Sequence, residues 1–198
     1  MEEPGHERQE GANQPESDTG VFARYCLKRL ASILATAVLL VLLLLRFLAV
    51  QPCFVPTDSM APTVRSGDHI LINTWVYHVR PPQRGDIVVY RAPPEAPAGE
   101  QLLVKRLIGL PGDRIQIWEG FLYRNGLPVR ENYLAAPMNY DFPGGNAVFT
   151  VPPDEVFLLG DNRNYSEDSH IWGPLPRENV LGRAFCLYWP RERMRVLH

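Results

Sequence analysis

The chain has 198 residues, a length that allows one domain of ordinary size or two small ones. Its net charge of −2 is spread unevenly, with −5 in residues 1–20, +4 in residues 21–50 and −1 in residues 51–198, which excludes a basic nucleic-acid-binding protein. An apolar fraction of 45% with 10% aromatic residues excludes intrinsic disorder beyond residue 20.

Residues 1–20 are acidic and rich in Gly, Pro and Gln, with almost no large apolar side chains. Such a segment buries too little apolar surface to offset the entropy of ordering its backbone. We therefore predict a disordered acidic tail over residues 1–20.

An uncharged stretch from Leu30 to Leu45 continues past Arg46 to Val50. As a helix, residues 30–50 would be roughly 31 Å long at ~1.5 Å per residue, about the thickness of a bilayer core. A buried core helix, an amphipathic surface helix and a cleaved signal peptide are the alternatives. Apolar residues on every side of the helix argue against a surface helix, and no small-x-small cleavage site follows the stretch. We predict that residues 21–50 form an uncleaved membrane anchor with a basic flank.

The charges beside the predicted anchor indicate its orientation. Arg24, Lys28 and Arg29 all lie on its N-terminal side. Because basic residues are retained in the cytoplasm, we expect a cytoplasmic N-terminus and an extracytoplasmic position for residues 51–198.

The segment after the anchor is typical of an all-β domain. Short runs rich in branched and aromatic residues predict strands, with no comparably long helical pattern among them. The predicted strands are 69–75, 86–90, 102–108, 114–118, 121–124, 156–159 and 183–189.

Turn signals separate these runs. Glu119-Gly120 predicts a two-residue hairpin and Asn125-Gly126 a tight turn. Gly-Asp pairs begin at residues 67, 85, 112 and 160, and the Pro-rich segments 91–99 and 135–153 predict loops.

Cys26, Cys53 and Cys186 lie far apart, without a C-x-x-C or H-E-x-x-H pattern. The sequence therefore indicates neither a zinc site nor a disulfide scaffold, and we expect no metal and no cofactor. Cys53 and Cys186 could pair outside the cytoplasm, although two unrelated buried thiols are favoured.

Lys105 is the only lysine in residues 51–198, and it lies in an apolar run from Leu102 to Leu110. Unlike arginine, a lysine can lose its proton in a dry pocket and act as a base. From composition alone, a surface lysine without a function is an equally good interpretation. If this run is a strand, Arg106 faces the opposite side.

Ser59 is one of four serines after the anchor, with Ser66, Ser166 and Ser169. It lies between Pro56 and Pro62, nine residues after Val50, and so at most about 30 Å from the end of the predicted anchor. Serine in a Pro-rich loop is usually a turn former, so the pattern leaves a nucleophile and a turn residue as alternatives.

Four segments, in order, resemble the conserved boxes of type I signal peptidases over residues 30 to 190. They are Pro56–Thr63, Gly67-Asp68, Lys105–Asp113, and Gly160–Ser169 followed by Trp172-Gly173. The resemblance implies a membrane-bound serine endopeptidase with a Ser/Lys dyad, on an extracytoplasmic β domain in the bacterial plasma membrane. Its partners would be secretory preproteins and the lipid bilayer, with no nucleic acid. It would remove signal peptides after small-x-small sequences.

Box by box, the resemblance implies a role for five residues. Ser59 would be the nucleophile and Lys105 the general base. The Thr57 hydroxyl and the Ser59 backbone N–H would form the oxyanion hole. Ser166 would orient the Lys105 amine, and Asp168 would brace that loop.

Phe54, Met60 and Leu107 are candidates for the substrate pocket, although each is equally well explained as a core residue.

His170 stands where the family commonly has Arg, so the ion pair that supports Asp168 would require a protonated His170. Ala61 stands where an acidic residue is frequent in the family.

Three alternative functions stay open at this point. The first is a Ser/His/Asp hydrolase that uses His69 or His170, although the sequence has no G-x-S-x-G elbow. The second is a specialised peptidase for a narrow substrate such as a pilin. The third is a catalytically inactive, anchored homologue that binds secretory partners.

Overall fold

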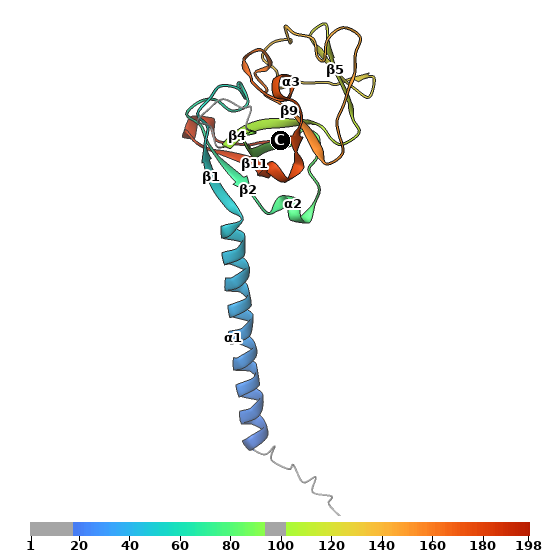
Figure 1. The fold of residues 1–198 in the computed structure, drawn as a ribbon. Coiled ribbons are helices and arrows are strands. Elements are labelled where there is room, and N and C mark those ends of the chain that lie inside the picture. Colours follow the sequence, from blue (N-terminus) through green and yellow to red (C-terminus); the bar gives the residue numbers. More distant parts are fainter. Residues whose placement is uncertain (1–17, 94–101) are drawn as a thin grey trace, which may run out of the picture. The chain divides into compact units, whose positions relative to one another are not determined.

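The computed structural model describes residues 18–93 and 102–198, and it is mainly β (Figure 1). The chain divides into two compact units, Met1–Phe47 and Leu48–His198, and each is described here by itself. Most of the predicted tail of residues 1–20 lies outside the described residues, and residues 18–20 begin the first helix.

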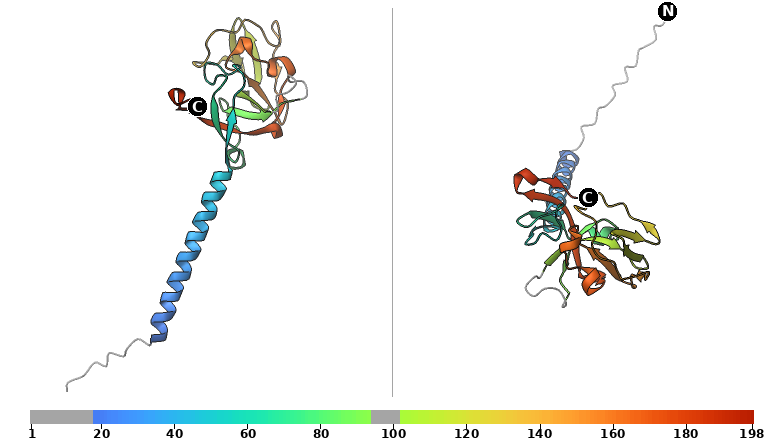
Figure 2. Two further views of the ribbon diagram at one scale, coloured as in Figure 1. Left: turned by 90° about the vertical axis from the view of Figure 1, so that its left-hand side faces the viewer. Right: turned by 90° about the horizontal axis from the view of Figure 1, so that it is seen from above.

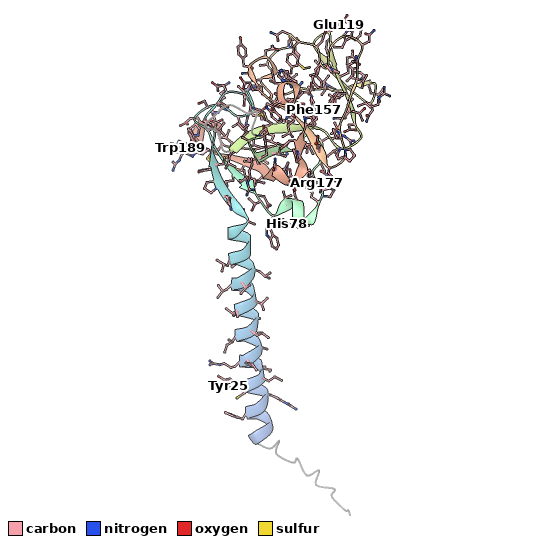
Figure 3. The ribbon with its side chains drawn as sticks, viewed as in Figure 1. Tyr25, His78, Glu119, Phe157, Arg177 and Trp189 are labelled. Carbon is pink, nitrogen blue, oxygen red and sulfur yellow. The ribbon has the colours of Figure 1, made fainter. Side chains whose placement is uncertain are left out.

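Helix α1 (Asp18–Leu48) contains an apolar stretch, Arg24–Leu44, with a mean hydropathy of 2.2. This stretch of 21 residues is long and apolar enough to cross a membrane. Side chains project from α1 on all sides in Figure 3, where Tyr25 is labelled, and none of this stretch is buried. The helix is therefore a candidate membrane span.

The helix ends earlier than residues 21–50 would suggest. The carbonyl oxygen of Ala49 accepts a hydrogen bond of 2.9 Å from the Thr74 N–H, and Val50 pairs with Asn73. These partners tie residues 49–50 to the end of β2, so they belong to the β unit and not to the helix.

The larger sheet has eight strands, all in antiparallel pairs, in the order β1-β2-β11-β3-β4-β9-β10, with β12 beside β11. This sheet curls, as the two further views in Figure 2 show. The strands are β1 (Val50–Phe54), β2 (His69–Asn73), β3 (Ile87–Arg91), β4 (Leu102–Gly109), β9 (Glu155–Leu159), β10 (Leu175–Pro176), β11 (Val180–Trp189) and β12 (Arg195–Val196).

The second sheet has the order β7-β6-β5-β8. Its strands are β5 (Arg114–Trp118), β6 (Phe121–Arg124), β7 (Leu127–Pro128) and β8 (Phe149–Thr150). Short helices complete the described fold: α2 (Val76–Val79), α3 (Ser169–Trp172), η1 (Arg163–Tyr165), η2 (Arg177–Asn179) and η3 (Arg191–Arg193).

Both predicted hairpin turns are present in the second sheet. Glu119 and Gly120 have φ of 49° and 82°, and Asn125 and Gly126 have φ of 56° and 80°. Two consecutive residues with positive φ are what a type I′ turn requires, and its twist suits two antiparallel strands. The pairing of Trp118 with Phe121 confirms the first hairpin.

The seven predicted strands correspond to β2, β3, β4, β5, β6, β9 and β11, with ends that differ by up to three residues. The strands that the pattern missed are β1, which continues an apolar run, and β7, β8, β10 and β12, which have two residues each. Pairs this short carry no alternation for a pattern to detect.

Strand β4 lies inside the larger sheet with both faces buried. Val104 packs in the cluster that includes Ile70, whereas Leu103 and Leu107 pack in the cluster that includes Tyr90. A third cluster lies under the second sheet and contains Phe157, labelled in Figure 3. The alternation places Lys105 on the Leu103 and Leu107 face, as predicted, and Arg106 on the other.

The four Gly-Asp pairs share one structural role. Each aspartate is buried and forms an ion pair with arginine, whose planar guanidinium can donate several hydrogen bonds to one carboxylate. The pairs are Asp68–Arg193 at 2.8 Å, Asp86–Arg80 and Asp86–Arg183 at 3.0 Å, Asp113–Arg84 at 2.8 Å and Asp161–Arg106 at 2.7 Å.

Cys53 and Cys186 flank strand β2 but face opposite sides of the sheet. Cys53 pairs with Ile70 and packs against the core, whereas Cys186 pairs with Leu71, the next residue along β2. Because neighbouring residues of a strand point to opposite faces, the two thiols cannot meet across β2. Both are free, and burial raises the pKa of the Cys53 thiol.

Candidate active site

Ser59 and Lys105 are 46 residues apart in the chain and meet in one hydrogen bond. Lys105 Nζ donates to Ser59 Oγ at 2.6 Å. Ser59 lies in a turn between β1 and β2, and Lys105 lies in the middle of β4. The sheet therefore supplies a fixed amine, and the turn presents a hydroxyl to it.

Lys105 is 2% exposed, although its type is among the least often buried. Leu103 and Leu107 stand two residues away on either side, on the same face of β4, and both are buried. A dry, apolar environment disfavours an ammonium relative to a neutral amine. The location is thus suited to a lysine that acts as a base.

The surroundings of the serine oxygen contain further donors. The Thr57 hydroxyl lies 3.2 Å from Ser59 Oγ. Within the described parts of the chain, the backbone N–H of Ser59 donates no hydrogen bond. Both groups are placed to donate to an oxygen atom that forms beside Ser59 Oγ.

The Ser59 turn is fastened to the loop that follows β9. The Asn162 backbone N–H donates to the Ser59 carbonyl oxygen at 3.0 Å, and the Asn162 side-chain amide donates to the Asp58 carbonyl oxygen at 3.1 Å. The Asp58 carboxylate accepts from the Ser66 N–H at 2.9 Å. These bonds fix the direction of the Ser59 side chain from two sides.

Asp168 organises the loop that carries Ser166. Its carboxylate is fully buried and accepts hydrogen bonds from the Ser166 hydroxyl at 2.6 Å and from the Gly160 N–H at 2.9 Å. The resemblance assigned the Ser166 hydroxyl to Lys105, and the bond described for this hydroxyl goes to Asp168. Asp168 also caps the first turn of α3 through the His170 N–H.

His170 occupies the position where a cation was expected to support Asp168. Its Nδ1 lies 2.7 Å from the Asp168 carboxylate, and its ring stacks on Tyr140 with 4.2 Å between the centroids. A neutral imidazole with its proton on Nδ1 can also donate this hydrogen bond. The contact therefore does not depend on a protonated His170. Burial and the nearby Asp168 charge raise the pKa of Tyr140.

A pocket of about 200 Å³ opens at the dyad. Its lining consists of Thr57, Asp58, Ser59, Leu103, Lys105, Tyr165 and Glu167. A larger cavity of about 650 Å³ exists near Tyr77 and Arg177, but it contains none of these residues. Sequence reasoning missed Asp58, Leu103, Tyr165 and Glu167. Their positions in the chain could have indicated three of them, because Leu103 lies two residues before Lys105, and Tyr165 and Glu167 flank Ser166.

The three predicted pocket residues lie elsewhere. Met60 and Leu107 are 1% and 0% exposed in two core clusters, and Phe54 is exposed with its ring against His69. None of the three lines the pocket beside Ser59. His69 does not line it either, so a role for His69 as the base has no geometric support.

A second set of contacts, which sequence reasoning also missed, supports the loop from the segment after β7. Glu131 and Arg163 form a buried ion pair, and Arg163 Nε donates to the Gly160 carbonyl oxygen at 3.0 Å. Tyr133 bonds to Glu131, and the Arg106 guanidinium stacks over the Tyr133 ring at 3.9 Å. The segment between β7 and β8 thus also supports the site.

Within the described ranges, no group of three or more His, Cys, Asp or Glu residues is placed to hold a metal ion. The chemistry that this pocket offers is nucleophilic attack by a hydroxyl beside an amine, which is the chemistry of a serine hydrolase.

Comparisons with known proteins agree with this class. A family model described as "Signal peptidase, peptidase S26" matches residues 27–189. The chain is 41% identical to "Probable signal peptidase I-1" of Synechocystis sp., over 78% of this chain and 79% of that protein. It is 37% identical to "Signal peptidase I" of Leptolyngbya laminosa, over 94% of this chain and 88% of that protein. A crystal structure of a signal peptidase I from Enterococcus faecalis V583 matches with a TM-score of 0.45 and 34% identity, over 52% of this chain and 97% of that chain.

The chain therefore belongs to the signal peptidase family, peptidase S26. It is a signal peptidase hydrolase, as the resemblance indicated.

Proposed function

We propose that this chain cleaves signal peptides from secreted preproteins through a Ser59/Lys105 dyad. The observation that carries the proposal is the hydrogen bond of 2.6 Å between Lys105 Nζ and Ser59 Oγ, inside a pocket and on a buried strand. A neutral Lys105 amine can accept the proton of the Ser59 hydroxyl along the same line.

In the first half of the reaction, the Ser59 oxygen attacks the scissile carbonyl carbon while Lys105 takes the hydroxyl proton. The carbonyl oxygen becomes negative, and the Thr57 hydroxyl and the Ser59 N–H stabilise it. The tetrahedral intermediate collapses to an acyl-enzyme, and the Lys105 ammonium returns its proton to the leaving amine. In the second half, water attacks the acyl-enzyme with Lys105 again as base, which restores the Ser59 hydroxyl.

Ser166 and Asp168 act as positioning residues in this proposal. Asp168 holds the Ser166 hydroxyl and the Gly160 N–H, and this loop is tied to the Ser59 carbonyl oxygen through Asn162. The role of Ser166 in orienting the Lys105 amine stays a prediction.

The proposal includes cleavage after small residues, because the resemblance to the family implies shallow apolar pockets that exclude bulky side chains. Small residues at the first and third positions before the cut remain part of the proposal. Phe54, Met60 and Leu107 contribute to it only as predictions.

The setting we propose is a bacterial plasma membrane with α1 as a single span. The basic residues Arg24, Lys28 and Arg29 favour a cytoplasmic N-terminus and an extracytoplasmic β unit. A preprotein held by its own apolar segment would present its cleavage site at the same membrane surface.

Two other functions compatible with the family are a peptidase for one narrow substrate, such as a pilin, and an inactive binding homologue. The full chain in detergent is incubated with a panel of preproteins, and mass spectrometry identifies the new N-termini. Cleavage of many preproteins after small-x-small sequences supports the proposal. Cleavage of a single class supports the specialised peptidase, and no cleavage supports the inactive homologue.

Variants test the dyad in the same assay. We expect Ser59→Ala and Lys105→Arg each to lower kcat at least about 10³-fold while the domain stays folded. Ser66→Ala is the matched control, because it removes an exposed hydroxyl near the same turn and leaves Ser59 in place. A Lys105→Arg enzyme with a normal rate would refute the dyad.

A further inference from the structure

The pocket beside Ser59 carries two carboxylates. Of its seven lining residues, the charged ones are Asp58, Lys105 and Glu167. Asp58 and Glu167 come from different segments, the Ser59 turn and the loop after β9, and both are exposed. A substrate that enters the pocket therefore passes between acidic residues from two sides.

The direction of the Glu167 side chain follows from the loop backbone. Ser166 and Asp168 have extended dihedral angles, with φ of −131° and −157°. Their side chains are buried and bond to each other at 2.6 Å. In an extended segment, the side chain between two inward-facing neighbours points outward. Glu167 accordingly lines the open side of the pocket, where Ser166 and Asp168 do not.

The two carboxylates of the pocket, Asp58 and Glu167, outnumber its one cation, Lys105. Glu167 makes no ion pair with any residue in the ranges 18–93 and 102–198. Lys105 is 2% exposed and bonds to Ser59, so it lies beneath the rim. Asp58 accepts a backbone N–H of Ser66, which orients its carboxylate without cancelling its charge.

We propose that Glu167, together with Asp58, selects substrates by charge: the rim favours a basic side chain beside the scissile bond and disfavours an acidic one. This inference rests on the proposed peptidase function and names a further property of its substrates. A partly exposed ion pair of this kind changes a rate constant by roughly two- to fivefold, and like charges change it by a similar factor in the opposite direction. The effect on kcat/KM also falls as salt screens the pair.

Glu167 is the residue to substitute, because the Asp58 carboxylate also holds the Ser59 turn through the Ser66 N–H. The substrates are peptides with one cleavage site. Each set varies one position, which carries Lys, Gln or Glu, and the varied positions run from two residues before the cut to two residues after it. We expect at least one position at which the full chain in detergent gives kcat/KM in the order Lys, Gln, Glu. At that position, Glu167→Gln should reduce the Lys-to-Glu ratio about three- to tenfold.

The matched control is Glu178→Gln, which removes the same charge from an exposed residue that lines the cavity near Tyr77 instead. Its Lys-to-Glu ratio should equal that of the unchanged chain. About 0.5 M salt should lower the ratio more in chains that carry Glu167 than in Glu167→Gln. An unchanged ratio in Glu167→Gln, or no position with a charge preference, overturns the inference while cleavage itself persists. Failure to cleave any peptide overturns the proposed function instead.

Discussion

Gly160 packs directly against the backbone of Ser59. A Cβ atom at Gly160 would collide with the Ser59 carbonyl oxygen and the Ser166 hydroxyl, and it would lie 2.6 Å from Ser166 Cβ. Glycine is therefore required at this position for the close approach of two chain segments, since its φ is not in the left-handed region. The contact fixes the distance between the serine turn and the loop that carries Ser166.

We predict that Gly160→Ala lowers kcat at least about tenfold, because a displacement of about 1 Å at a catalytic group is this costly. Steady-state kinetics on a cleavable peptide measures the effect. Gly126→Ala is the control: its φ of 80° makes alanine strained, but no atom lies within 4 Å of the added Cβ. It should cost about 1 kcal/mol of stability and leave kcat unchanged. Equal kcat values for the two variants would contradict the role of Gly160.

The sequence predicted most of this architecture because local chemistry determines it. Runs of β-branched residues give β3, β4 and β9, and paired turn residues such as Asn125-Gly126 fix the hairpins. The boundary between α1 and β1 was harder to predict from the sequence. An apolar run that continues across Leu48 has the same composition in a helix and in a strand, and only pairing with β2 decides between them.

The dyad was predictable from its motifs, whereas its support was not. No pattern indicates that Glu131 meets Arg163, since the pair is 32 residues apart and joins two loops. The residues that line the pocket were equally hard to predict from the sequence. Both faces of β4 are buried, so the sequence could not show that Leu103 borders the pocket while Leu107 belongs to the core.

The bond between His170 and Asp168 gives a second prediction. Removing a donor to a buried carboxylate costs about 1–3 kcal/mol, so His170→Ala should destabilise the loop and lower kcat/KM several-fold. His170→Asn keeps an N–H donor near the position of Nδ1 and should recover most of the activity. Steady-state kinetics on a cleavable peptide and denaturant unfolding measure the two effects. Unchanged stability and kcat/KM in His170→Ala would contradict a supporting role for this hydrogen bond.

The buried pair of Glu131 and Arg163 gives a third prediction. The side chains are 5% and 1% exposed, so removing one charge leaves the other uncompensated. Glu131→Gln should therefore cost about 3–5 kcal/mol of stability. The double variant Glu131→Gln with Arg163→Met removes both charges and should recover part of that loss.

The kcat of the double variant distinguishes a role of this ion pair in stability from a role in positioning the catalytic loop. Arg163 Nε also holds the Gly160 carbonyl oxygen, and no methionine can replace that donor. The double variant should thus stay low in kcat even where its stability is restored, as chemical denaturation and peptide kinetics would show. Restored kcat in the double variant would mean that the pair serves stability alone.

Asp113 gives a prediction about pH. Burial by itself raises the pKa of this carboxyl, but hydrogen bonds from Arg84, the Leu110 N–H and Asn125 outweigh it and hold the pKa at about 2. An unfolded chain has an aspartate pKa of about 3.9, so the folded state binds its proton less readily. The stabilisation is therefore fully present above pH ~4 and is lost as pH falls toward 2.

A difference of this size corresponds to roughly 2–3 kcal/mol as an upper value, and the partial exposure of Arg84 reduces it toward about 1 kcal/mol. Asp113→Asn removes the titration while keeping the shape of the side chain. We expect the stability difference between the unchanged chain and Asp113→Asn to shrink by roughly two thirds of that contribution between pH 6 and pH 2.5, measured by denaturant unfolding in detergent. Because Asp86, whose pKa is also lowered, titrates in both proteins, its contribution cancels from the difference. A stability difference that stays constant over this range would show that Arg84, Leu110 and Asn125 do not hold the Asp113 charge.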